Sequence, residues 1–192
     1  MFAILLCGGT FDKVYDPSAQ ILTVTEGTSA APTILGDGRV SPDEWKVIRL
    51  MAKDSIDMDD GDRRAVLDKI LYLLSEYDGA VVIHGTDTLV QTACLVKDVM
   101  GCVSRGFRAK PVIFTGAMVP HAVRGTDASF NLGFAMGVVK VFHQVGQGGV
   151  HVAIQGKVFD PAKVVKADAS FKPSPPCEPF QVKNAKLSQS NK

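Results

Sequence analysis

Hydrophobic residues along this chain gather in short continuous runs rather than in alternating patterns. The runs cover residues 2–6, 80–83, 111–115 and 151–154. Continuous apolar runs of this length are typical of strands that are covered on both faces, as in parallel sheets. We therefore predict that these four segments form buried strands of one parallel sheet.

Segments with helical spacing lie between these runs. Residues 62–77 place apolar side chains on one stripe that ends before Gly79. Two further helices are predicted, one over about 87–100 with Gly101 as its stop, and one over about 128–143. Strands that alternate with helices favour parallel pairing, because parallel strands need long crossover connections.

Residues 41–44 have the pattern of a helix start. The sequence Ser-Pro-Asp-Glu combines a capping box with a proline at the first helical position. Trp45, Ile48 and Met51 follow at helical spacing. We therefore predict another helix from this point.

The elements together predict an α/β fold with a doubly wound, mostly parallel sheet in three layers. A chain of 192 residues with 46% hydrophobic residues can bury one sizeable core. We expect a single domain over residues 1–167, followed by a proline-rich extended arm and polar C-terminal tail over 168–192. Residues 12–38 are expected to form a hairpin or a long lid-like loop.

Charge and cysteine usage narrow the class of partner. The 21 Lys and Arg residues nearly balance the 20 Asp and Glu residues, which argues against nucleic acid or an anionic membrane as partner. The four cysteines (7, 94, 102 and 177) form no close pair, and the four histidines show no metal-ligand spacing. The chain start lacks a basic region and no run is long enough to span a bilayer, so we expect a cytoplasmic protein with a small-molecule partner.

Candidate chemistry stands where the predicted strands end, because ligands of such folds bind at the carboxyl ends of the strands. "CGGT" follows the first strand and brings Thr10, and "HGTDTL" follows the second and brings Thr86, Asp87 and Thr88. Taken singly, each of these is also explained as a turn or a helix cap. Lys110 stands at the start of the third run, the end away from the threonines, and spacing alone does not place it beside them.

Other catalytic templates are missing from the sequence. It contains no G-x-x-x-x-G-K-[ST] phosphate loop, no G-x-G-x-x-G after the first strand and no G-x-S-x-G nucleophile elbow. These absences argue against a P-loop nucleotide hydrolase, a dinucleotide enzyme and a serine hydrolase of the α/β-hydrolase kind.

Four segments together resemble one family, the bacterial-type L-asparaginases and glutaminase-asparaginases. "CGGTFD" resembles the family's opening signature and "HGTDTL" its second signature. "KPVIFTGAMVP" followed by "HAVRGTDASFNL" resembles the next family block, except that Val119 replaces a frequent arginine, and "DSIDM" resembles the segment with the substrate-binding serine. The resemblance extends from residue 1 to about 170, which is the family's N-terminal domain.

The resemblance implies a hydrolase that cleaves the side-chain amide of asparagine, or of a related small amide, through a threonine acyl-enzyme. Thr10 matches the nucleophile, and Thr86, Asp87 and Lys110 match the second threonine with its aspartate and lysine. Ser55 and Asp87 match contacts to the carboxylate and amine of the substrate, and Tyr15 is the one candidate for the tyrosine of the mobile loop.

This assignment is chemically reasonable without a metal or an organic cofactor. A threonine hydroxyl needs a neighbouring base to become a nucleophile, and a desolvated lysine amine can act as that base. Backbone N–H groups near Gly9 and Gly85 can stabilise the oxyanion, typically by roughly 3 kcal/mol per donor.

Two main functions remain open at this point, besides an unrelated hydrolytic activity or a subunit completed by a separate protein. The first is the amidohydrolase described above, and the second is a non-catalytic amino-acid-binding or regulatory module that keeps the asparaginase pocket. In both cases we expect a homo-oligomer, because family sites borrow groups from a neighbouring subunit and the segment "SFNLGFAMGVV" is apolar enough to bury against one.

Overall fold

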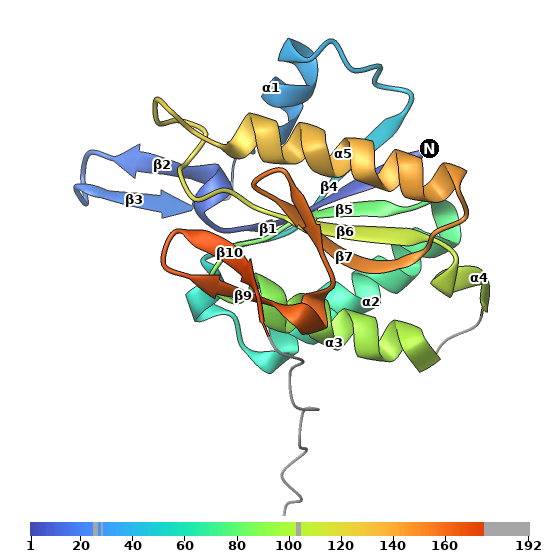
Figure 1. The fold of residues 1–192 in the computed structure, drawn as a ribbon. Coiled ribbons are helices and arrows are strands. Elements are labelled where there is room, and N and C mark those ends of the chain that lie inside the picture. Colours follow the sequence, from blue (N-terminus) through green and yellow to red (C-terminus); the bar gives the residue numbers. More distant parts are fainter. Residues whose placement is uncertain (25–26, 28, 103–104, 175–192) are drawn as a thin grey trace, which may run out of the picture.

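A six-stranded sheet forms the centre of the molecule in the computed structural model, which describes residues 1–24, 27, 29–102 and 105–174 (Figure 1). The strand order is β4-β1-β5-β6-β7-β8. All neighbours are parallel except β7 and β8, which are antiparallel. The bounds are β1 Phe2–Gly8, β4 Trp45–Lys53, β5 Ala80–Ile83, β6 Pro111–Thr115, β7 Gly149–Ile154 and β8 Lys157–Phe159. The predicted α/β fold with a mostly parallel sheet is confirmed.

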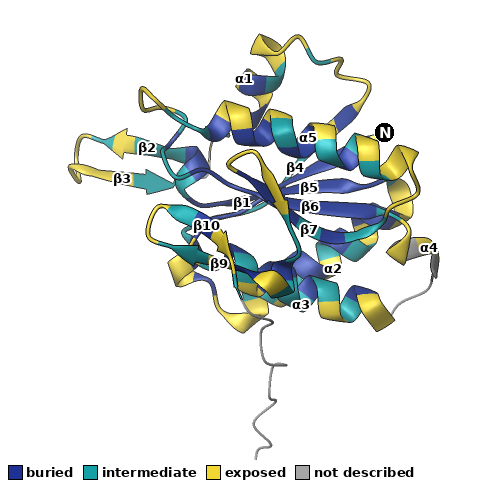
Figure 2. Cartoon of the chain, viewed as in Figure 1, coloured by how far each residue is buried: buried dark blue, intermediate teal, exposed yellow. Residues whose placement is uncertain are grey.

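Helices cover both faces of this sheet. Helices α1 (Ala30–Asp37) and α5 (Ala128–Gln144) lie on one face, and α2 (Asp60–Glu76) and α3 (Leu89–Cys102) lie on the other (Figure 1). Successive side chains of a strand point to opposite faces of the sheet, so the core has two clusters. Ile4 and Leu6 pack in the cluster with α1 and α5, and Leu5 packs in the cluster with α2 and α3. The central strands β1, β5 and β6 are therefore buried on both sides (Figure 2).

Three predicted helices are confirmed close to their expected bounds. They are α2, whose capping box joins Asp59 and Asp62, together with α3 and α5. The expected stop at Gly101 is wrong, because α3 continues through Gly101 to Cys102. The short helix α4 (Arg105–Arg108) precedes β6 and was not predicted.

The helix predicted after residues 41–44 is wrong. These residues lead into β4, an edge strand that pairs in parallel with β1 from Phe2↔Trp45 onward. The ring centroids of Phe2 and Trp45 lie 5.3 Å apart. Apolar residues at 45, 48 and 51 fit a helix locally, but pairing with a strand more than forty residues away decides the conformation.

Two small hairpins stand at the carboxyl end of the parallel strands. One consists of β2 (Lys13–Asp16) and β3 (Ile21–Val24), and the other of β9 (Val164–Ala167) and β10 (Ser170–Pro173) (Figure 1). The first is the hairpin that was one of the two alternatives for residues 12–38, whereas helix α1 in the same range was not predicted. Short 3-10 turns complete the fold at η1 (Thr10–Asp12), η2 (Ser55–Asp57) and η3 (Pro161–Lys163).

The extended arm expected from residue 168 does not begin there. Ser170 pairs with Ala167 and Pro173 with Val164, so the predicted boundary falls in the turn of a hairpin. The reason is packing, since Phe171 and Val164 are buried in the core cluster beside α2 and α3. The remainder of the predicted arm and tail, residues 175–192 with Cys177, lies outside the described residues.

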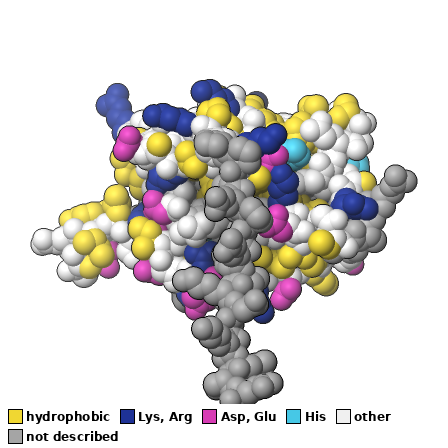
Figure 3. All heavy atoms as spheres, turned by 60° about the horizontal axis from the view of Figure 1, so that its bottom comes forward, with side chains coloured by type: hydrophobic (Ala, Val, Ile, Leu, Met, Phe, Trp, Pro, Cys, Tyr) yellow, Lys and Arg dark blue, Asp and Glu magenta, His cyan; other side chains and the backbone are white. Residues whose placement is uncertain are grey.

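The surface carries charges of both signs close together. On the face shown in Figure 3, basic and acidic side chains are interspersed. Ion pairs of the described residues include Lys97–Asp160 and Lys53–Asp62. Among the described residues, no helix has the length and apolar character that crossing a membrane requires.

Candidate functional site

The ends of three parallel strands touch through glycine backbone. Gly8 ends β1 and Gly9 follows it, with φ values of 92° and 85°. A Cβ atom on Gly9 would lie 2.2 Å from Gly85 Cα, and one on Gly116 would lie 2.5 Å from the His84 carbonyl oxygen. Only glycine fits such approaches. Thr10 and Thr86 each follow one of the touching glycines, so the structure brings the two threonines into one region.

Thr10 begins the 3-10 turn η1 and is half-buried. The turn is held from both sides. The Gly9 N–H donates to the Lys53 carbonyl over 2.8 Å, and Asp12 Oδ1 accepts from Ser29 Oγ and from the Ala30 N–H, both over 2.9 Å. The Gly9 N–H is thus engaged in the fold, so the role of Gly9 is the close approach to Gly85 and not the donation of a hydrogen bond to a ligand.

A lysine that the sequence did not single out lies beside the second threonine. Lys166 on β9 places its Nζ 2.9 Å from Thr86 Oγ1 and 2.5 Å from Asp87 Oδ1. Thr86 is only 3% exposed, and the Lys166 side chain is 20% exposed. A hydroxyl, an amine and a carboxylate are therefore in direct contact at the end of β5.

Ser55 completes the described cluster from the neighbouring strand end. It begins η2 after β4 and is fully buried, and its hydroxyl has no hydrogen-bond partner within the described residues. A Cβ atom on Gly85 would lie 2.5 Å from Ser55 Oγ, and Thr88 Oγ1 donates to the Ser55 carbonyl over 2.8 Å. A buried hydroxyl without a partner is costly unless a ligand supplies one.

Lys110 is not part of this cluster. It stands directly before β6, at the amino end of the sheet, and its Nζ donates to the carbonyls of Leu74 (2.7 Å) and Tyr77 (2.9 Å) at the end of α2. β6 runs from there to the site edge, and five strand residues span about 16 Å. The expectation that Lys110 accompanies Thr86 and Asp87 is therefore wrong, and Lys166 occupies that place.

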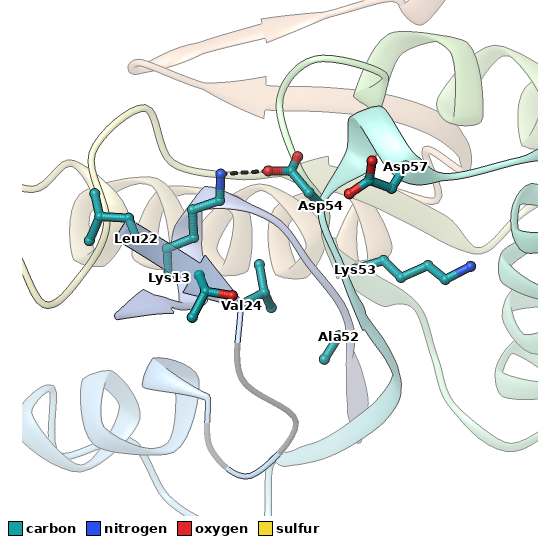
Figure 4. Close-up of a pocket in the computed structure, with 8 residues that line it drawn as sticks. Lys13, Leu22, Val24, Ala52, Lys53, Asp54 and Asp57 are labelled. Carbon is teal, nitrogen blue, oxygen red and sulfur yellow. Dashed lines mark ion pairs between the residues drawn. The ribbon is translucent and has the colours of Figure 1, made fainter. Parts of the chain in front are cut away.

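Tyr15 lies on the β2–β3 hairpin and is 59% exposed. The hairpin stands over a cleft of about 440 Å³ (Figure 4), lined by Lys13, Leu22, Thr23, Val24, Ala52, Lys53, Asp54 and Asp57. An ion pair of 2.5 Å between Lys13 and Asp54 spans this cleft and joins the hairpin to the segment that carries Ser55. No hydrogen bond joins Tyr15 to the threonines in the described structure.

His84 supports the second strand end from within the core. It is fully buried, and burial lowers the pKa of its imidazole to about 4. Nδ1 lies 2.9 Å from the Gly85 carbonyl, which only accepts, so Nδ1 carries the proton. Nε2 then accepts from the Thr92 hydroxyl over 3.0 Å. A neutral histidine thus holds the Gly85 turn, consistent with a structural role.

Metal-ligating side chains do not gather in the described part of the chain. No group of three or more His, Cys, Asp or Glu side chains there has an arrangement suited to a metal ion. The groups that the site offers are hydroxyls, one amine, one carboxylate and backbone amides. This set suits recognition of a small zwitterion and attack on a carbonyl carbon.

Lys166 could not be identified from sequence pattern alone. Lys163, Lys166 and Lys172 are similar in their surroundings along the chain, and only the hairpin register places Lys166 opposite the buried Phe171. The structure has a turn at Asp168, where φ is 54°, but a turn there does not determine which of these lysines faces the site.

Comparison with known proteins identifies the same family that the motifs suggested. Residues 2–181 match the family model described as Asparaginase, N-terminal. An L-asparaginase of Dirofilaria immitis is 27% identical over 190 residues, which cover 86% of this chain and 31% of that protein. An L-asparaginase of Thermococcus kodakarensis is 36% identical over 93 residues, which cover 47% of this chain and 25% of that protein.

Solved structures show the same fold. The thermostable L-asparaginase from Thermococcus kodakarensis superposes with a TM-score of 0.70 at 24% identity, covering 90% of this chain and 50% of that one. A probable cytoplasmic L-asparaginase from Campylobacter jejuni gives 0.67 at 29% identity, covering 86% and 49%. This chain thus spans about half the length of the solved relatives. The chain belongs to the asparaginase family, and the family's N-terminal domain is the part that it matches.

Proposed function

We propose that this protein hydrolyses the side-chain amide of asparagine, or of a related small amide, through a covalent threonine ester. Thr10 Oγ1 attacks the amide carbon, the C–N bond breaks, and ammonia leaves with the proton that the hydroxyl gave up. Water then attacks the ester, which releases a carboxylate and restores the Thr10 hydroxyl. The net change is amide plus water to carboxylate plus ammonium.

Lys166 takes the role of the base in this proposal. In its unprotonated form the amine accepts the proton that Thr10 releases, with the Thr86 hydroxyl between them as relay, and later returns it to the leaving amine. The distance of 2.9 Å between Lys166 Nζ and Thr86 Oγ1 is the observation that carries the proposal. Asp87, 2.5 Å from the same nitrogen, stabilises the ammonium form and keeps the side chain in place.

Substrate recognition is proposed to use Ser55 and Asp87. The buried, unpartnered Ser55 hydroxyl donates to the α-carboxylate of the substrate. The Asp87 carboxylate, whose side chain is 40% exposed, accepts from the α-ammonium. The Gly85 N–H remains the proposed oxyanion donor, and Tyr15 the proposed lid residue, which closure of the β2–β3 hairpin would bring toward the substrate.

Ammonia release from asparagine and glutamine tests the proposal. We expect Thr10→Ala to abolish release while its circular dichroism spectrum stays that of the parent, because the substitution removes only the attacking oxygen. Thr10→Ser keeps that oxygen and should keep measurable turnover. Undiminished release by the folded Thr10→Ala variant would refute the mechanism.

A second candidate is a binding module that keeps the pocket without turnover. The observation in its favour is the buried Ser55 hydroxyl without a hydrogen-bond partner among the described residues, which a bound ligand satisfies whether or not turnover follows. Calorimetry would then show binding of aspartate or asparagine with no ammonia formed. Loss of binding in Ser55→Ala would locate it at this site, and absence of both binding and turnover would exclude both candidates.

We also propose that the protein is a homo-oligomer in the cytoplasm. Phe130, Val141 and Val145 are 61%, 53% and 67% exposed and share one face of α5 and its end, where Phe130 and Phe134 stack with centroids 6.2 Å apart. Light scattering at micromolar concentration should report more than one chain per particle, and a Val141→Lys variant should dissociate. A particle of one chain would refute this part.

A further inference from the structure

The β9–β10 hairpin, which carries Lys166, makes no strand pairing with the central sheet. It forms a two-stranded sheet of its own beside α3 (Figure 1). Its inner side chains Val164 and Phe171 are buried, which fixes its base against the core. The position of its turn, and with it the exact place of Lys166, needs a further attachment.

Gln155 supplies this attachment through one side-chain amide. Its Nε2 donates to the Ala169 carbonyl over 2.9 Å, and its Oε1 accepts from the Phe171 N–H over 3.2 Å. Because one partner only accepts and the other only donates, the orientation of the amide is defined. Phe171 is the residue directly opposite Lys166 in the hairpin register, so Gln155 holds the position that faces Lys166.

Gln155 is itself fixed by a buried amide. Its N–H donates to Asn131 Oδ1 over 2.9 Å, and Asn131 is fully buried in α5. Asn131 Nδ2 donates to the Gly116 carbonyl over 2.9 Å and to Asp127 Oδ2 over 2.8 Å. A continuous chain of hydrogen bonds thus runs from the end of β6 through Asn131 and Gln155 to the hairpin. Lys166 then reaches the end of β5.

The backbone of Gln155 gives an independent reason to assign it a role. Gln155 and Gly156 form the two-residue loop between β7 and β8, where Ile154 pairs with Lys157, and both have positive φ (53° and 71°). Loops with positive φ at both positions favour Asn-Gly, because asparagine tolerates the left-handed region better than longer side chains do. Glutamine is therefore a poor choice for the turn, but it has the length to reach the hairpin.

We propose that Gln155 is a positioning residue, which sets Lys166 against Thr86 and Asp87 by tethering the β9–β10 hairpin. Its effect on turnover rests on the function proposed above, whereas its effect on the position of Lys166 does not. Glutamine at position 155 makes the β7–β8 turn less favourable, but its length allows it to position the Lys166 amine.

Gln155→Asn separates the tether from the turn. Asparagine suits the left-handed backbone but is one methylene shorter, so the melting temperature should stay or rise while kcat falls about tenfold with little change in KM. Gln155→Gly removes the tether while also tolerating the backbone, and should lower kcat as much. Gln20→Asn is the matched control for melting temperature and labelling, since Gln20 is exposed and also has a positive φ of 56°.

Competitive acetylation, read by mass spectrometry, measures how accessible the Lys166 amine is and does not depend on catalysis. Lys172 on β10 is exposed and serves as the internal reference. We expect the labelling of Lys166 relative to Lys172 to rise several-fold in Gln155→Asn and Gln155→Gly, but not in Gln20→Asn. Unchanged labelling in the folded Gln155 variants would overturn the proposal. If the parent protein releases no ammonia, the proposed function fails, and the labelling ratio alone still decides the role of Gln155.

Discussion

Replacing each of two lysines by methionine should separate turnover from stability. Lys166 touches Thr86 and Asp87, whereas Lys110 touches two backbone carbonyls at the far end of the sheet. Methionine keeps most of the hydrocarbon stem and removes the amine. We expect Lys166→Met to lose activity without losing the fold, and Lys110→Met to lose stability without losing activity.

The magnitudes follow from the surroundings of each amine. The Lys166 and Asp87 side chains are 20% and 40% exposed, so their ion pair contributes only about 0.2–1 kcal/mol to the free energy of unfolding after solvent screening. For a chain of this size that is a melting-temperature change within about 4 °C. Loss of a general base lowers kcat by about 10²–10⁴.

Lys110 has the opposite profile. Its ammonium satisfies carbonyls of Leu74 and Tyr77 that the end of α2 leaves without helical partners. Losing these charged hydrogen bonds at a half-buried position should cost about 1–2 kcal/mol, or about 3–6 °C in melting temperature. Its distance from Thr10 leaves kcat unchanged.

The assay pairs ammonia release with thermal melting followed by circular dichroism, on the parent and both variants. Turnover by a folded Lys166→Met variant at the parent rate would refute the assignment of the base. A Lys110→Met variant that melts like the parent yet has lost its activity would indicate that Lys110 acts in the site, which would contradict the structure.

Three further predictions rest on single contacts. Burial lowers the pKa of His84 to about 4, below the 6.5 expected when unfolded, so the unfolded state takes up a proton first as the pH falls. The free energy of unfolding should therefore decrease by roughly 3 kcal/mol between pH 6.5 and 4. Urea titrations of His84→Gln should lack this pH dependence. Gly85→Ala should destabilise the protein by about 1–3 kcal/mol and raise KM, because its methyl group would lie 2.5 Å from Ser55 Oγ. Gly137→Ala has open space around its Cβ and should stabilise α5 by up to about 1 kcal/mol. Equal melting temperatures for the two variants would contradict this. Lys13→Met should speed proteolysis within the β2–β3 hairpin, since it removes the ion pair to Asp54, and a cleavage rate equal to that of the parent would show that the pair does not hold the hairpin.

The fold was predictable where burial alone determines conformation. Strands β1, β5 and β6 are covered on both faces, and residues such as Leu5, Val82 and Phe114 are fully buried, so their runs could be read without knowing their partners. Strand β4 was not predictable in this way. It lies at the edge of the sheet, and its spacing suits a helix until pairing with β1 is taken into account.

Part of the candidate site was also predictable from the strands, and part was not. Thr10, Ser55 and Thr86 follow strand ends directly, so strand direction places them at one edge of the sheet. Strand direction also places Lys110 at the other edge, although the motif that contains it suggested otherwise. Lys166 is 80 residues from Thr86 along the chain and reaches it through a hairpin whose position depends on Gln155. No local pattern carries that information.

The place of Lys166 on β9 has a consequence for biosynthesis. The parallel strands of the sheet are complete once Ile154 has been made, and Thr10 leaves the ribosome long before β9 does. On the proposed chemistry, a nascent chain can then have its nucleophile, its binding serine and its sheet, and still be inert. On that chemistry it becomes active only when the β9–β10 hairpin docks, so amide hydrolysis waits for residues that are made after the parallel strands.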